Sequence, residues 1–269
     1  MIATPTSSTM RILLHRFAGS VLRTLLPASC SLCGAASGEM LCDDCAAQFF
    51  GSGAAIARCA CCANPLPGAI GGTGAAESGS GVHGVRNGAE LCGSCISEPP
   101  AFDLTVVAAD YAMPVDQLVL QLKFGHRLAL ASLLARLLRD AIAQRPGLVL
   151  PALLCPVPLG PRRLAERGYN QALEIARPLS RSLGVALHPR LANRVLETAA
   201  QSSVAPDQRQ QNIAGAFAIP DMALVRGRHI GVVDDVMTSG RTLNELAATL
   251  KRHGAARVSN FVFARTPPH

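Results

Sequence analysis

The chain of 269 residues has no tryptophan and only two tyrosines. The chain therefore has few aromatic side chains on which the bases of a nucleic acid could stack. Long apolar runs are also missing, so we expect neither a secretory leader nor a membrane span and assign the protein to the cytoplasm. Residues 1–26 are basic and amphipathic, and we expect them to form a helix that docks on the rest of the protein. Association of this helix with a membrane is the alternative.

Lysine is scarce, because 23 of the 25 basic residues are arginine. The charge is also uneven along the chain. Residues 1–110 carry 5 basic and 8 acidic residues, a net charge of −3, whereas residues 111–269 carry 20 and 10, a net charge of +10. The C-terminal part is therefore expected to bind an acidic ligand, and arginine suits bidentate contacts with phosphate. A GC-rich genome that encodes arginine in place of lysine would explain the composition equally well.

Cysteine is the residue that the chain has in excess. Without an export signal, disulfide bonds are not expected in a reducing compartment. Two C-x-x-C pairs supply the four thiolates of a tetrahedral structural zinc site, so four pairs predict two zinc ions. Redox-active or free thiols are the alternative. Eight of the ten cysteines form such pairs: Cys30 and Cys33, Cys42 and Cys45, Cys59 and Cys62, Cys92 and Cys95.

The spacing does not decide how the four pairs combine. Sequential pairs are the simplest arrangement, and an interleaved one stays open. Cys61 competes with Cys59 as the partner of Cys62, and the two-residue spacer favours Cys59. Cys155 stands in an apolar run and is predicted to be a small buried residue. We assign residues 27–100 to a zinc module with a disordered, glycine-rich insertion at about 66–90.

From about residue 101 to the end at 269, candidate strands and helices alternate. Such alternation predicts a domain with an α/β sheet that binds ligands at the carboxyl ends of its strands. Pro178 is expected to kink or end the helix that contains it. The expected strands cover 104–111, 147–158, 212–219, 228–235 and 257–266, and the expected helices cover 127–143, 170–184 and 242–254.

The stretch "VVDDVMTSGRT", residues 232–242, places two adjacent acids between a buried strand and a turn. Two carboxylates there repel each other and add nothing to a core. Asp234 and Asp235 can, however, accept hydrogen bonds from two hydroxyls of a sugar. The backbone N–H groups of the turn and the start of the next helix form a cradle for phosphate, and Gly240 allows close approach. Acids that merely cap the helix are the alternative.

The stretch at 232–242 resembles the phosphoribosyl pyrophosphate (PRPP) loop of type I phosphoribosyltransferases. The four cysteine pairs resemble the ComF family of competence-associated proteins, as do "PPAFDLTVVAADYAMPVDQLVLQLKFGHRLAL" (99–130), "CPVPLGPRRLAERGYNQALEIARPLS" (155–180) and "ETAAQSSVAPDQRQQNIAGAFA" (197–218). The resemblance covers roughly residues 20–266 without the glycine-rich insertion. It implies a type I phosphoribosyltransferase-like domain with a mainly parallel sheet, preceded by a double zinc ribbon.

The resemblance also implies roles for individual residues. Asp234 and Asp235 would be catalytic and contact the ribose 2- and 3-hydroxyls of PRPP. The PRPP-binding residues would be Asp234, Asp235, Val236, Met237, Thr238, Ser239, Gly240, Arg241 and Thr242. The turn after the strand that ends in "PVP" would face pyrophosphate and its Mg²⁺ through Leu159, Gly160, Pro161, Arg162, Arg163 and Arg167. Each of these arginines would otherwise be a solvated surface charge.

Two further residues have more than one interpretation. Arg209 would belong to a mobile lid. Lys123 is interpreted as a surface residue at a helix end, with a place near the active site as the alternative.

Three functions follow from the resemblance. The first is a DNA-handling protein of natural competence that binds PRPP with Mg²⁺ and contacts single-stranded DNA and other competence proteins. The second is an enzyme that transfers the phosphoribosyl group of PRPP to a nitrogen acceptor, which the sequence does not identify. The third is a PRPP-sensing regulator without a DNA role.

Overall fold

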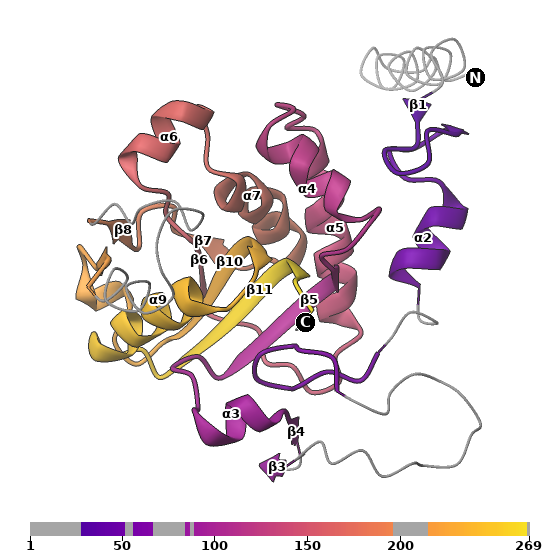
Figure 1. Cartoon of the computed structure of the whole chain (residues 1–269). Coiled ribbons are helices and arrows are strands. Elements are labelled where there is room, and N and C mark those ends of the chain that lie inside the picture. Colours follow the sequence, from indigo (N-terminus) through magenta and orange to yellow (C-terminus); the bar gives the residue numbers. More distant parts are fainter. Residues whose placement is uncertain (1–27, 52–55, 67–83, 87–88, 196–214, 268–269) are drawn as a thin grey trace, which may run out of the picture. The chain divides into compact units, whose positions relative to one another are not determined.

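The computed structural model describes residues 28–51, 56–66, 84–86, 89–195 and 215–267 (Figure 1). The chain divides into two compact units, Met1–Gly53 and Ala54–His269. The predicted helix at 1–26 and Arg209 lie outside the described residues. Within the described ranges, no helix has the length and apolar character needed to cross a membrane.

The first unit is a small knuckle followed by a helix. Strands β1 (Ala28–Ser29) and β2 (Ala36–Ser37) pair antiparallel, and α2 (Asp43–Phe50) begins directly after Cys42. Asp43 and Asp44 occupy the first turn of α2, where the helix dipole favours negative charge. The amide of Gly34 donates to the carbonyl of Cys30 (2.9 Å) and closes the turn between the first two cysteines.

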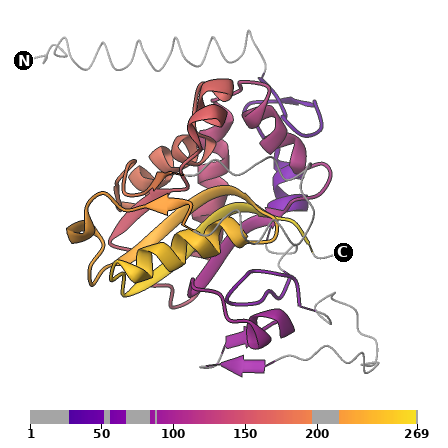
Figure 2. The same ribbon diagram turned by 60° about the vertical axis from the view of Figure 1, so that its left-hand side comes forward.

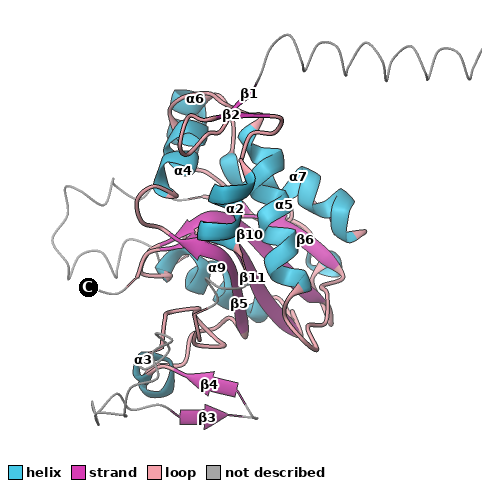
Figure 3. Cartoon of the chain, turned by 90° about the vertical axis from the view of Figure 1, so that its right-hand side faces the viewer, coloured by secondary structure: helices cyan, strands magenta, loops and turns pink. Residues whose placement is uncertain are grey.

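The second unit is built on a sheet of five parallel strands in the order β5-β11-β10-β6-β7, four of which are labelled together in Figure 3. Most residues of β10 and nearly all residues of β11, the two central strands, are buried, as expected for a sheet covered on both faces. The predicted α/β arrangement is therefore confirmed. The five strands are β5 (Leu104–Asp110), β6 (Leu153–Pro156), β7 (Ala186–Leu187), β10 (His229–Met237) and β11 (Arg257–Arg265).

Helices cover the two faces of this sheet (Figures 1 and 2). On one face, α5 (Leu130–Ala143) packs against β5 and β11, and α7 (Gln171–Leu183) packs against β10, β6 and β7. On the other face lies α9 (Arg241–Arg252), with its apolar side against β11. Helix α7 continues through Pro178 to Leu183, so the proline does not end it.

Shorter elements surround the sheet. They include α4 (Asp116–Lys123) and α6 (Pro161–Arg167), which the sequence analysis did not anticipate. Strands β8 (Asn193–Arg194) and β9 (Phe217–Ala218) pair antiparallel, and the 3-10 helix Met222–Leu224 follows β9. Strands β3 (Gly84–Arg86) and β4 (Ala89–Leu91) form a hairpin before α3 (Gly93–Ser97), so part of the segment expected to lack structure is paired.

The second half of the cysteine-rich region belongs to the core of this unit. Cys59, Cys62 and Cys95 are buried in the same apolar cluster as Leu243 and Leu246 of α9. The chain from Arg58 to Leu66 is therefore packed on the α9 side of the sheet, as part of one folded body.

Candidate functional site

The two adjacent acids lie near the end of the central strand β10. Asp235 is 7% exposed, and Asp234 is partly buried. The amide of Asp235 donates to Oδ1 of Asp234 (2.9 Å), which fixes the first carboxylate against the backbone of the second. Val236 and Met237 complete the strand, and Thr238 and Ser239 are exposed in the turn that follows.

Lys123, the last residue of α4, is the cation at this site. Its Nζ lies 3.0 Å from Oδ2 of Asp235, and its side chain is only 20% exposed. The interpretation of Lys123 as a surface residue is therefore wrong, because it is paired with the acid that we singled out. The ion pair offsets the repulsion between the two carboxylates, since it places a positive charge beside one of them.

Asp234 has an unusual protonation equilibrium. Burial raises the pKa of its carboxyl to about 8, and the neighbouring charge of Asp235 acts in the same direction. The positive charges of Lys123 and Arg194 lower this pKa but do not offset the burial. Without a bound cation or a hydroxyl donor, the pair thus carries less than two full negative charges near neutral pH.

The turn after β10 leads into α9 through Gly240. This residue has φ of +77°, a backbone conformation that residues with a Cβ rarely adopt, so the turn favours glycine. Gly240 also occupies the N-cap position of α9 without providing a side-chain cap. Amide groups of the first turn, which begins at Arg241 and Thr242, are therefore open to an anion.

The turn expected to face pyrophosphate follows β6. Leu159 and Pro161 line a cavity of about 560 Å³ that also contains Tyr169, Asn170 and Arg194. The Tyr169 hydroxyl donates to the carbonyl of Leu122, one residue before the lysine that pairs with Asp235. A hydrogen bond therefore connects a residue that lines the cavity to the end of α4.

The arginines predicted near this turn are engaged in local contacts. Nε of Arg162 lies 2.9 Å from Oε1 of Glu166 in an exposed ion pair within α6. The guanidinium of Arg167 stacks over Phe124, with its Cζ 5.4 Å from the ring centroid, and donates to Gln171 (3.0 Å). Arg163 is half-buried on the same helix.

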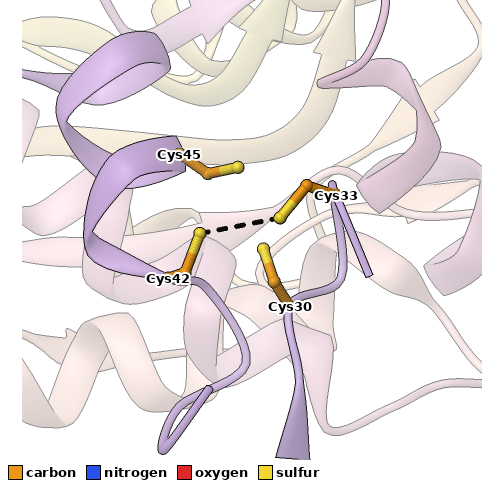
Figure 4. A group of neighbouring side chains, drawn as sticks. All are labelled: Cys30, Cys33, Cys42 and Cys45. Carbon is orange, nitrogen blue, oxygen red and sulfur yellow. Dashed lines mark hydrogen bonds between the residues drawn. The ribbon is translucent and has the colours of Figure 1, made fainter. Parts of the chain in front are cut away.

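The structure gathers the eight paired cysteines into two clusters, each of which could hold a metal ion. Within each cluster the sulfur atoms lie within 4.8 Å of one another. Both clusters combine sequential pairs. Figure 4 shows the four thiols of the first unit pointing toward a common centre. The clusters are Cys30, Cys33, Cys42 and Cys45, and Cys59, Cys62, Cys92 and Cys95.

The distances between sulfur atoms test which chemistry fits. Sγ of Cys33 lies 3.7 Å from Sγ of Cys42, and Sγ of Cys62 lies 3.5 Å from Sγ of Cys92. Zn–S bonds of about 2.3 Å in a tetrahedron separate two sulfurs by about 3.8 Å. A disulfide would need about 2.05 Å. The spacing thus matches tetrahedral metal ligation.

The two remaining cysteines belong to neither cluster, although the thiol of Cys61 lies within hydrogen-bonding reach of Cys95. Cys61 is excluded from the second cluster, and its Sγ lies 3.6 Å from the carbonyl oxygen of Phe102. Cys155 is fully buried in β6, where burial raises the pKa of its thiol to about 12, as expected for a small residue of the core.

Comparison with known proteins decides the family. A family model described as "Phosphoribosyl transferase domain" matches residues 170–268. The chain is 40% identical over 178 residues to the "DNA utilization protein YhgH" of Escherichia coli K12, covering 65% of this chain and 78% of that protein. It is 34% identical over 184 residues to "Competence protein F" of Haemophilus influenzae, covering 66% and 79%. The chain belongs to the ComF family.

The fold class expected for a ComF protein is confirmed, since the parallel sheet and the family match agree on a type I phosphoribosyltransferase fold. Among solved structures, a glutamine PRPP amidotransferase from B. subtilis is 15% identical, with a TM-score of 0.29. The alignment covers 48% of this chain and 25% of the amidotransferase.

Two arginines that the sequence pattern did not single out lie beside the expected site of this ComF protein. Arg194 lies in β8, and its charge acts on Asp234. Arg265 ends β11 and donates to the carbonyl of Met237 (3.0 Å). Both contacts join segments far apart in the chain. A signal was nevertheless available for Arg265, because it ends the apolar run "NFVFAR" as the two acids end theirs.

The raised pKa of Asp234 predicts how the stability of the unliganded protein depends on pH. From about pH 4 to pH 8 the folded state keeps a proton that the unfolded chain has released, so the free energy of unfolding falls as pH rises and levels off above pH 8. Asp234→Asn removes this term. We expect the variant to melt at least about 3 °C above the wild type at pH 8 and to match it near pH 4.

Thermal unfolding followed by circular dichroism at both pH values, without ligand, checks this expectation. Asp140→Asn is the control for loss of an exposed carboxylate, because Asp140 lies on α5 beside Arg139. A difference between Asp234→Asn and the wild type that stays constant with pH would contradict the assignment.

Proposed function

We propose that this ComF protein binds PRPP with Mg²⁺ at the end of β10 and acts in the uptake or use of DNA. The observation that carries the proposal is the position of Asp234 and Asp235. Two carboxylates stand near the end of a buried parallel strand, followed at once by a turn with open amides. That combination suits a sugar diol next to a phosphate. The role in DNA use rests on the names of the relatives.

Each part of PRPP has a counterpart in the chain. The two acids accept hydrogen bonds from the ribose hydroxyls, and the turn from Thr238 to Thr242 holds the 5-phosphate. Leu159 to Arg162 and Arg167 face the pyrophosphate. When bound, Mg²⁺ neutralises the charge that builds up on the leaving pyrophosphate. The ion pair with Lys123 orients the carboxylate of Asp235 before the ligand arrives.

An enzymatic function is the second candidate. The cavity of about 560 Å³ beside the turn after β6 offers room for an acceptor. In such a transfer, the bond from the anomeric carbon to pyrophosphate breaks and its electron pair leaves with pyrophosphate. A nitrogen of the acceptor forms the new bond and loses its proton. The chain's contribution would be to position the sugar and to exclude water.

Single-stranded DNA is the proposed macromolecular ligand. The net charge of +10 over residues 111–269 supports contacts with the phosphate backbone. The few aromatic residues argue against a large contribution from base stacking. Other competence proteins are proposed partners in the same process.

We further propose that each cysteine cluster holds one structural zinc ion. Four sulfur ligands close the coordination shell and leave no position for a substrate. The described cysteines are all free of disulfide bonds, which fits a protein of the reducing cytoplasm.

The PRPP site is tested by titrating PRPP with Mg²⁺ into the purified protein by calorimetry. We expect Asp234→Asn/Asp235→Asn to weaken binding at least about 100-fold, because two charge-assisted hydrogen bonds to the diol are lost. Asp140→Asn is expected to bind as the wild type does. No binding to the wild type, or unchanged binding to the double variant, would reject the site.

The zinc sites are tested by measuring metal content by mass spectrometry. The wild type should carry two zinc ions per chain, one for each cluster. Cys59→Ser should lose one of them, whereas Cys61→Ser, two residues away, should keep both. Loss of zinc from the Cys61 variant, or metal-free wild-type protein, would contradict the assignment.

DNA binding is tested with a fluorescent single-stranded oligonucleotide followed by anisotropy. The affinity should fall steeply with salt, with a slope in the log–log plot of about −0.7 for each phosphate contacted. A methylphosphonate oligonucleotide of the same sequence, which lacks the backbone charge, should not bind. Binding that is insensitive to salt, or equal for the two backbones, would exclude contact through phosphates.

A further inference from the structure

Arg265 connects the second cysteine cluster to the turn after β10. Arg265 is the last residue of β11 and is only 7% exposed. Its Nε donates to the carbonyl of Cys62 (3.3 Å), and its Nη1 donates to the carbonyls of Met237 (3.0 Å) and Thr238. One buried guanidinium thus contacts a residue of the cluster and two consecutive carbonyls at the end of β10 and the start of the turn, here called the phosphate turn.

The positions of these carbonyls determine where the neighbouring amides point. In a trans peptide, the C=O and N–H groups lie on opposite sides. The carbonyl of Met237 shares its peptide with the N–H of Thr238, and the carbonyl of Thr238 shares its peptide with the N–H of Ser239. Both carbonyls are held on the side of Arg265, where the amide of Thr266 also donates to the carbonyl of Met237 (3.0 Å). Both amides are therefore directed to the opposite side, where they can donate to an anion.

The space between the cluster and the turn is only partly filled. A cavity of about 540 Å³ lies there, lined by Cys62 and Cys95 on one side and by Ser239 and Gly240 on the other, with Arg265 in its wall. The guanidinium therefore bridges a gap that apolar packing does not close. A shorter or apolar side chain at this position would leave the carbonyls of the turn without this donor.

The cluster itself is anchored to the sheet by a second arginine. Nη1 of Arg58 lies 2.8 Å from Oδ1 of Asp110 at the end of β5 and donates to the carbonyl of Ala63 (3.2 Å). On the other side, the amide of Ala101 donates to Oδ1 of Asn244 in α9 (2.7 Å). The cluster region is therefore fixed relative to both the end of β5 and the first turns of α9.

We propose that Arg265 is a positioning residue that couples the metal of the second cysteine cluster to the phosphate turn. The inference rests on the zinc proposed for the second cluster and, for its PRPP readout, on the proposed PRPP site. A metal at the cluster would fix the carbonyl of Cys62, and this carbonyl orients the guanidinium of Arg265. The guanidinium in turn holds the peptides of the turn so that the amides of Thr238 and Ser239 point toward the phosphate. A coupling of this kind is reciprocal, so PRPP also slows release of that metal.

The first readout is hydrogen exchange of the segment 237–243, measured by mass spectrometry in the full chain without ligand. We expect Arg265→Met to speed exchange in this segment about tenfold, because charged donors to its carbonyls are lost. Arg257→Met, at the start of the same strand, is the matched control and should leave this exchange unchanged. Arg265→Lys keeps the charge without the planar fork and should give an intermediate rate.

The second readout is PRPP binding with Mg²⁺ by calorimetry. Arg265→Met should weaken binding about tenfold, while its zinc content stays at that of the wild type. If Arg265→Met does not fold, Arg265→Lys and removal of the metal from the wild-type protein by a chelator test the coupling instead. Stripping the second cluster should speed exchange in 237–243, and PRPP should slow zinc release from this cluster. The first cluster lies in the other unit and serves as the internal control.

The outcomes separate the two proposals. If the wild type binds no PRPP, the proposed function fails, and the exchange of the unliganded turn still decides the role of Arg265. The coupling would be overturned if neither Arg265→Met nor metal removal changed the hydrogen-exchange rate of segment 237–243 from that of the untreated wild type. PRPP binding that is unchanged in a folded Arg265→Met variant would also overturn it.

Discussion

Two carboxylates held side by side near the end of a buried strand are the constraint on which the site depends. β10 lies between β11 and β6, and its apolar residues are buried on both faces, so the strand cannot shift to separate the acids. The repulsion is offset locally. Lys123 neutralises Asp235, and Asp234 holds its proton more tightly than an exposed carboxyl would. The free protein therefore stores an unfavourable arrangement that a cation and a diol would relieve.

The sheet supplies the rigidity that this arrangement needs. Gly231, in the middle of β10, shows how tight the packing is, because a Cβ there would come within 2.8 Å of Leu154, Pro151 and Phe261. Because β10 is packed this tightly, its last residues keep a fixed position. The turn that follows has two exposed residues, Thr238 and Ser239. The structure thus combines a fixed strand end that carries two carboxylates with a more exposed turn that hydrogen bonds from other residues hold.

Much of the site could be predicted because its elements are local in sequence. The strand, the two acids, the turn and the helix of residues 229–252 follow one another, so apolar pattern and turn chemistry suffice to find them. Lys123 and Arg265 are different. Each reaches the site from an element remote in the chain, α4 or β11, and only the topology of the sheet brings them there. A lysine at a helix end has the same local pattern whether it faces solvent or a carboxylate, and for that reason the sequence favoured the wrong interpretation.

The same distinction applies to the cysteines. Spacing identifies ligand pairs, because two thiols three residues apart reach one metal. It does not reveal that the two clusters have unequal positions. Cys59, Cys62 and Cys95 share an apolar core with the strands and α9, whereas the first cluster belongs to the unit that ends at Gly53. Metal binding adds directly to the stability of the structure that it orders. At the second cluster, that structure includes the backbone around Arg265 and hence the turn beside the acids. We therefore propose that a metal bound there, far from any reacting atom, would influence ligand binding through hydrogen bonds to carbonyl groups.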